Sequence, residues 1–218
     1  GEGWYSLDVR YYKKFDLPGR QYGEGHCLQR LTKEARSVAC AGLGVEFDMA
    51  CCHARFILSK SLEIQGKTDD WATHPILRKF TRHYRLWRAF LTKYDSTLSL
   101  DDAKKSLQRI LYTGKPTHDL PFLWALFAEV LKASDVILAS DEFEYLNDMF
   151  GNRRNPCASR LFYAISKLED KSLLDFTAKI KDSFNGCKIC SYIFDGTIVI
   201  FPGGCDMAKI KEFTKTML

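Results

Sequence analysis

SYIFDGTIVI, residues 191–200, places Asp-Gly between two runs of apolar and β-branched residues. Asp-Gly in that position is among the strongest short-range signals for a β-hairpin, because both central residues of a type I′ turn need positive φ. On this interpretation Asp195 is only a turn former. A tight hairpin also presents the carboxylate at its tip to a metal ion, and the stretch alone leaves both interpretations open.

A second acidic stretch, VEFDM at residues 45–49, predicts a short strand that gives way to a helix in ACCHARFILSKSLE. Side chains alternate along a strand, so Glu46 and Asp48 share one face of it. Asp48 and Asp195, on separate strands, suit two Mg²⁺ or Mn²⁺ ions about 3.5–4 Å apart, as in phosphoryl-transfer sites. Waters and phosphates complete the shell of Mg²⁺, so one or two carboxylates suffice. We therefore predict Asp48 and Asp195 as catalytic metal ligands and Glu46 as a further metal ligand.

Helices dominate the rest of the chain. Apolar periodicity and the positions of Pro and Gly predict helices at 28–40, 50–63, 74–94, within 96–115, at 121–134, 156–184 and 206–217, with a further strand at 4–9. The sequence therefore predicts an α+β fold, in which a small antiparallel sheet carries the two acidic motifs and packs with many helices. No internal repeat or long linker is evident, so we expect one compact unit over residues 1–218.

The composition permits several classes of function. With 46% hydrophobic and 13% aromatic residues, the chain is long enough to bury a sizeable core. The net charge of +5 is mildly basic, which permits a nucleic-acid partner without requiring one. Eight cysteines form no regular framework, which favours a reducing, intracellular compartment, and the lone Cys187-Lys-Ile-Cys190 favours packing over a metal or redox role. No run approaches the ~18 apolar residues of a membrane span, so we expect no membrane association.

The predicted helix at 74–94 has an apolar and a cationic face. The apolar stripe recurs at i, i+4, i+7 and i+11 and consists of Phe80, Tyr84, Trp87 and Leu91. Arg78, Arg82 and Arg85 lie on the opposite side of the helix. A basic stripe like this one can follow a phosphate backbone, so the three arginines are candidates for nucleic-acid binding. The alternative is an ordinary solvated face.

The helix predicted within 96–115 carries a candidate phosphate-binding cation. Ser99 and Asp102 resemble a capping box, and Gly114 stands where a helix ends. Lys105 lies two turns before Tyr112, and such a cation can stabilise the charge of a triphosphate. The simpler alternatives are a solvated lysine and a tyrosine at the end of a helix core.

In their order, these parts resemble the palm and fingers of template-dependent DNA polymerases of families A and B. VEFDMACCHARFIL is similar to motif A, above all in divergent polymerase-like proteins of large DNA viruses, phages and protists, where Glu46 and Asp48 fill the two acidic places. The preceding KEAR, residues 33–36, matches the run that comes before motif A in that group. AKKSLQRILYTGK resembles motif B, because Lys105 and Tyr112 are seven residues apart.

SYIFDGTIVI resembles motif C of the same group, which reads Phe-Asp-Gly. Ser159, Leu161 and Glu169 fall where that group has a helix ahead of motif C. The resemblance covers residues 28–200 and has departures: motif C has one Asp where family B has two, Ala54 replaces the usual Pro of motif A, and no exonuclease domain fits the length.

The resemblance implies a palm-like unit with a fingers-like helical insertion at about 74–135, and nucleotidyl transfer from a nucleoside triphosphate to a 3′ hydroxyl. Asp48 and Asp195 would hold both metals, and Lys105 would bind the triphosphate. Tyr112 would lie near the nascent base pair or sugar. Arg36 and Arg109 would be further candidates for phosphate contacts. The implied partners are a nucleic-acid template and primer, nucleoside triphosphates and, in a larger assembly, other protein subunits.

Two rival functions stay open. A polymerase-derived subunit that has lost catalysis, and binds nucleic acid or acts as a scaffold in a ribonucleoprotein or replication complex, fits the small size and the single motif C aspartate. A metal-dependent nuclease would use the same two carboxylates, because two-metal chemistry also cleaves phosphodiesters. Lys105 argues against the nuclease, since hydrolysis needs no triphosphate-binding lysine.

Overall fold

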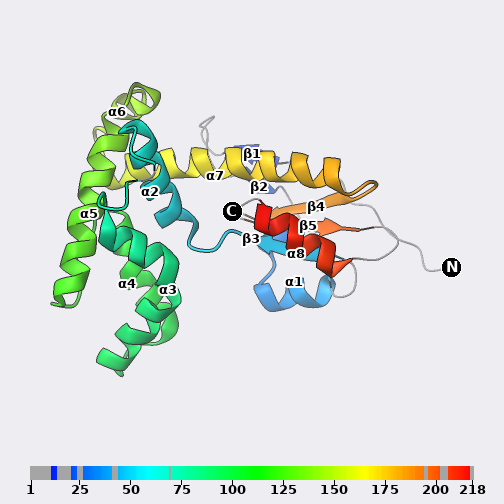
Figure 1. Cartoon of the computed structure of the whole chain (residues 1–218), viewed down its shortest axis with the longest axis horizontal. Helices are drawn as coiled ribbons and strands as arrows, with labels where there is room; N and C mark the ends of the chain where they lie inside the picture. The colour runs from blue at the N-terminus through cyan, green and yellow to red at the C-terminus, as the bar shows by residue number, and fades with distance from the viewer. Residues whose placement is uncertain are drawn as a thin grey trace. The chain divides into compact units, whose positions relative to one another are not determined.

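The computed structural model describes residues 11–13, 21–23, 27–40, 44–68, 70–193, 196–201 and 206–216 (Figure 1). Asp195 and the strand predicted at 4–9 lie outside the described residues. The fold is α+β and mostly helical, with a small antiparallel sheet, which confirms the predicted fold class.

The helices and strands follow one another along the chain. They are β1 (Tyr11–Lys13), β2 (Gln21–Gly23), η2 (Leu28–Arg30), α1 (Lys33–Ala39), β3 (Gly44–Asp48), α2 (Cys52–Ile64), α3 (Pro75–Tyr94), α4 (Leu100–Leu111), α5 (Pro121–Leu138), η3 (Asp141–Phe143), α6 (Leu146–Phe150), α7 (Pro156–Ser183), β4 (Lys188–Ile193), β5 (Gly196–Ile200) and α8 (Met207–Thr216). The contacts within the chain divide it into two compact units. The first unit consists of residues 1–50 together with residues 167–218, and the second consists of residues 51–166. The predicted helical insertion at about 74–135 falls within the second unit, and the single unit that we expected remains a prediction.

The three-stranded sheet of the first unit has the order β3-β5-β4, with both pairs antiparallel (Figure 1). The hairpin predicted from SYIFDGTIVI is therefore present as β4 and β5. Its register differs from the prediction, because Gly196 pairs with Ile193 and belongs to β5 and not to the turn. A Cβ at position 196 would lie 2.4 Å from the carbonyl oxygen of Phe47, so glycine is needed here for close strand approach and not for positive φ.

Alternation along β3 separates an apolar face from an acidic one. Phe47 packs against Phe176 of α7, with ring centroids 5.2 Å apart. Phe176 in turn contacts Phe213 of α8 at 5.9 Å, so both helices supply aromatic rings to this face of the sheet. Glu46 and Asp48 flank Phe47 on the strand and are exposed, which confirms the period-two prediction that they share the other face.

The second unit is built around the helix α5, which contacts α2, α3 and α4. Its core-facing residues recur at helical spacing and are fully or almost fully buried; they include Leu123, Leu126, Val130, Ala133 and Ile137. α5 also caps α3, because the carboxylate of Glu129 accepts hydrogen bonds from the backbone amides of Ile76 (3.1 Å) and Leu77 (2.8 Å). A carboxylate at a helix N-terminus satisfies amides that have no partner within the helix.

Both ends of α4 follow the sequence signals, with one change at the C-terminus. The hydroxyl of Ser99 accepts from the amide of Asp102 at 3.1 Å, as a capping residue should. At the other end the amide of Gly114 donates to the carbonyl of Arg109 at 2.8 Å. The left-handed residue that such an ending needs is Thr113, with φ of 61°, and not the glycine after it.

We therefore expect Thr113→Gly to raise the free energy of unfolding by about 1 kcal/mol, because glycine adopts positive φ without the steric cost that a Cβ imposes. Urea titration monitored by circular dichroism measures this change. Thr92→Gly, inside α3, is the matched control and should lower the same quantity by roughly 0.3–0.5 kcal/mol, the difference in helix propensity between threonine and glycine. A destabilised Thr113→Gly variant would show that the threonine makes a stabilising contact that outweighs its backbone strain.

Candidate functional site

The two predicted acidic strands are neighbours in the sheet. β3 pairs with β5 along its whole length (Figure 1). In this pairing Asp48 lies opposite Gly196, the residue that follows Asp195 in the chain. Asp195 lies outside the described residues. The carboxylate of Asp48 is exposed, and no ion pair or side-chain hydrogen bond involves it among the residues that the structure describes. An exposed carboxylate at the end of this strand suits a hydrated divalent cation.

The other acidic side chain of β3 already has a cationic partner. Arg36 of α1 lies with its Nη2 atom 3.6 Å from Oε1 of Glu46, and its Nη1 atom donates to the carbonyl of Leu31 at 2.9 Å. Arg36 was predicted as a phosphate contact and Glu46 as a metal ligand, and in the structure they pair with each other. Asp48 is thus the carboxylate of β3 that keeps its negative charge uncompensated among the described residues.

Cysteines near the sheet do not add soft metal ligands to this site. Burial raises the pKa of the Cys40 thiol, and the nearby Cys190 and Glu46 raise it further. Burial also raises the pKa of Cys187 and Cys190, the two members of the C-x-x-C sequence. Thiols with raised pKa stay protonated at neutral pH and are poor ligands and nucleophiles, in keeping with a packing role. Cys40, Cys187 and Cys190 are free thiols.

In the unit of residues 51–166, a residue of the predicted motif A forms a hydrogen bond with a residue of the predicted motif B. The hydroxyl of Tyr112, just after α4, is hydrogen-bonded to Nδ1 of His53, in the first turn of α2. The two rings meet edge to face with centroids 5.4 Å apart. The ring of Phe162, on α7, also contacts Tyr112, with centroids 5.6 Å apart. Tyr112 was predicted as a substrate contact, and this hydrogen bond fixes where its hydroxyl lies. The pairing itself was not predicted, because 59 residues separate the partners.

The predicted triphosphate-binding cations lie on the outer side of α4. Lys105 and Arg109 are exposed, and four residues apart on a helix they share one face. Nζ of Lys105 lies 3.4 Å from Oδ1 of Asp102. The hydrogen bond from Ser99, and then the contact with Lys105, lowers the pKa of Asp102. Pairs of this kind at the surface are weak, so Lys105 can exchange Asp102 for a more highly charged anion.

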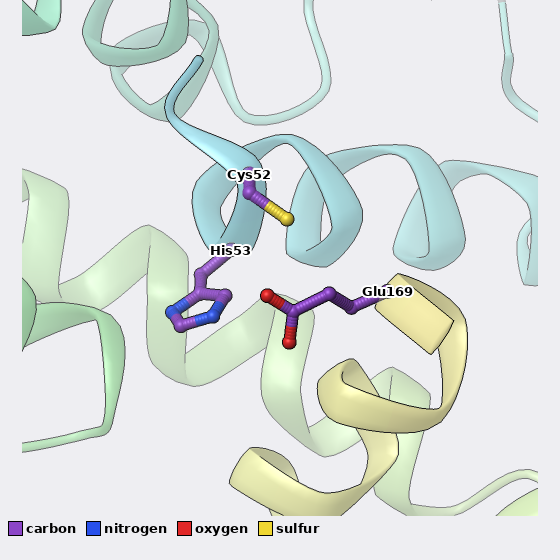
Figure 2. A group of neighbouring side chains, drawn as sticks. All are labelled: Cys52, His53 and Glu169. Atoms are coloured by element: carbon purple, nitrogen blue, oxygen red, sulfur yellow. The ribbon is translucent and has the colours of Figure 1, made fainter. Parts of the chain in front are cut away.

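Cys52, His53 and Glu169 form another group of side chains with metal-ligand atoms. Figure 2 shows Cys52 and His53 at the beginning of α2 and Glu169 on α7. A thiol and an imidazole are ligands that Zn²⁺ prefers, whereas Mg²⁺ prefers oxygen atoms alone. This group therefore gives no support to the predicted Mg²⁺ ions, which depend on the carboxylates of the sheet.

The three arginines predicted to bind nucleic acid have different surroundings on α3. Arg78 donates to the carbonyls of Asp70 (2.7 Å) and Thr73 (3.2 Å), so its guanidinium holds the loop that precedes the helix. Arg82 is exposed, and its guanidinium lies 4.1 Å from the centre of the Trp71 ring. Arg85 is also exposed and donates to the hydroxyl of the neighbouring Tyr84 at 3.1 Å. Arg82 and Arg85 are thus better placed than Arg78 to contact a ligand.

No protein-family model matches the chain, and no curated protein or solved structure gives a significant match to it. None of the helices in the described ranges combines the length and the apolar character that crossing a membrane requires. A function for this chain therefore has to be inferred from its own residues and their arrangement.

Proposed function

We propose that the protein is a template-dependent nucleotidyltransferase of the DNA polymerase type, which transfers a nucleotide from a nucleoside triphosphate to a 3′ hydroxyl. The observation that carries this proposal is the pairing of β3 with β5, in which Asp48 lies opposite the residue that follows Asp195. Two carboxylates on adjacent antiparallel strands are the minimum protein contribution to a two-metal site.

Asp48 and Asp195 are the residues that would hold two Mg²⁺ or Mn²⁺ ions. Asp48 suits this role, because it is exposed while the neighbouring Glu46 is paired with Arg36. When bound, such ions activate the attacking hydroxyl and neutralise the charge that develops on the phosphates. Arg36 keeps Glu46 partly neutralised, so that a third full negative charge does not repel the incoming triphosphate.

The other proposed roles belong to side chains of residues 51–166. Lys105, with Arg109 on the same face of α4, binds the phosphates of the triphosphate. Tyr112, held by its hydrogen bond to His53, lies near the base pair or sugar of the incoming nucleotide. The cations of α3 bind the nucleic-acid strand. In this proposal the partners are a template, a primer and nucleoside triphosphates in a reducing, intracellular compartment.

The test is a primer-extension assay with the purified chain, an end-labelled primer on DNA and RNA templates, and Mg²⁺ or Mn²⁺. We expect the primer to lengthen only when nucleoside triphosphates and metal are both present, and lengthening to stop when the metal is chelated. Shortening of the labelled strand without nucleoside triphosphates would instead identify a nuclease. Absence of any change on every template with both metals would exclude the transfer reaction for the isolated chain.

A second candidate is a polymerase-derived subunit that binds nucleic acid without catalysis and serves as a scaffold in a larger complex. The observation that favours it is the concentration of cations on α3, which needs no metal site to be useful. Asp195→Asn distinguishes the two candidates. A scaffold keeps its biological function in that variant, whereas a nucleotidyltransferase loses it.

A further inference from the structure

The positive charge of the chain is concentrated on one helix. α3, PILRKFTRHYRLWRAFLTKY, carries six Lys and Arg residues and no Asp or Glu. This local excess is larger than the net charge of +5 for all 218 residues. Like charges close together on a helix repel one another, so binding of an anionic ligand to this face is favourable. Arg88 already lies 3.8 Å from Asp101 of α4, which leaves the other five cations for such a ligand. The partner that this helix suits is therefore polyanionic.

Beyond its kink at His83, α3 exposes two parallel rows of side chains at i, i+4 and i+8. One row is Arg85, Ala89 and Lys93. The adjacent row is Leu86, Phe90 and Tyr94, which are 66%, 50% and 57% exposed. Large apolar side chains in a continuous exposed row mark a binding surface more often than single ones do.

The rings on this face are held by neighbours of the same unit. Phe90 meets Phe122 of α5 edge to face, with centroids 5.2 Å apart. Tyr94 meets His118 in the same way at 6.4 Å. These ring contacts restrict the rotation of Phe90 and Tyr94, so part of the entropy cost of ordering them on a ligand is already met.

We propose that this outer face of α3 binds single-stranded nucleic acid. Arg82, Arg85 and Lys93 contact successive phosphates, and bases stack on Phe90 and Tyr94. Cations that follow the backbone, together with aromatic rings that accept unpaired bases, are the two components of sequence-tolerant single-strand binding. A duplex offers the cations its phosphates but keeps its bases stacked inside, whereas a single strand offers a regular row of phosphates together with unpaired bases. The inference deepens the nucleic-acid-binding part of the proposed function and does not need catalysis.

Fluorescence anisotropy with a labelled single-stranded oligonucleotide tests the inference, with EDTA present and without nucleoside triphosphates, so that catalysis cannot contribute. We expect tighter binding to the single strand than to a duplex of the same sequence. Phe90→Ala should weaken single-strand binding roughly tenfold and leave duplex binding almost unchanged, because one stacked base is lost. Phe90→Trp should bind at least as tightly as the wild type. Arg85→Ala should weaken binding to both and reduce the slope of log affinity against log salt by about one.

Matched controls are Met149→Ala, an exposed apolar side chain on α6, and Lys104→Ala, an exposed cation on α4. Both should bind as the wild type does. Equal affinity for single strand and duplex, with no effect of Phe90→Ala in a folded variant, would overturn the proposal. Self-association that depends on Phe90, without oligonucleotide binding, would assign the face to protein contacts and overturn it as well. Primer extension that fails while single-strand binding is intact would exclude only the transfer reaction.

Discussion

Asp48→Asn is expected to lower template-directed nucleotide addition about a thousandfold. A metal-bound carboxylate contributes several kcal/mol of charge stabilisation to phosphoryl transfer, and each 1.36 kcal/mol corresponds to a factor of ten. The substitution keeps the shape of the side chain and removes its charge. Asp48 is exposed at the end of β3, so the free energy of unfolding should change by less than about 0.5 kcal/mol. Single-turnover primer extension at saturating Mg²⁺ measures the loss.

The neighbouring acidic residue provides an internal comparison. Glu46 lies on the same face of β3 but is paired with Arg36 at 3.6 Å, so Glu46→Gln should reduce the rate much less than Asp48→Asn. Asp175→Asn, on an exposed position of α7, should leave the rate unchanged. Equal losses for Glu46→Gln and Asp48→Asn would mean that Arg36 releases Glu46 to the metal when substrate binds. An active Asp48→Asn variant would exclude the proposed metal site.

Leu126→Ala should produce the largest loss of stability, about 3–5 kcal/mol in the free energy of unfolding of the unit of residues 51–166. Leu126 is fully buried on α5, the helix that contacts α2, α3 and α4. Removing its isobutyl group leaves a cavity that rigid helices on several sides cannot close. Urea unfolding followed by tryptophan fluorescence measures the change, since this unit contains Trp71, Trp87 and Trp124.

Two control variants test whether the loss of stability in Leu126→Ala comes from the buried cavity. Leu126→Met preserves volume and should cost less than about 1.5 kcal/mol. Leu86→Ala removes the same atoms from a side chain of the same unit that is 66% exposed, so its effect should be several-fold smaller. If Leu126→Ala and Leu86→Ala had similar effects, burial on α5 would not be the source of the stability.

The elements that could be predicted from the sequence are those specified by neighbouring residues. The boundaries of α4 follow from the capping serine and the terminal turn, and α3 follows from its apolar periodicity. The register of the hairpin did not follow from Asp-Gly, because the position of Gly196 in β5 depends on its close approach to the Phe47 carbonyl on another strand. Turn chemistry contains no information about a third strand.

The candidate site likewise has features that residue types predict and features that depend on tertiary contacts. The acidic motifs predict both Asp48 and Glu46 as metal ligands, but the pairing of Arg36 with Glu46 depends on the positions of α1 and β3 relative to each other. The contact of Tyr112 with His53 likewise depends on tertiary packing. For α3, charge spacing selected Arg78 together with Arg82, whereas the loop carbonyls that accept from Arg78 are visible only in the structure. The single-stranded character of the proposed ligand depends on the exposure of Phe90 and Tyr94, which periodicity alone does not give.

The pairing of β3 with β5 has a consequence for synthesis of the chain. β3 leaves the ribosome before residues 51–166 and has to wait for β5, which is translated about 150 residues later. Long-range strand pairing of this kind is slow, whereas helices with local contacts form early. The helices of residues 51–166 can therefore fold while the acidic strand is still unpaired, and translation that stops before β5 leaves Asp48 without the strand that positions it.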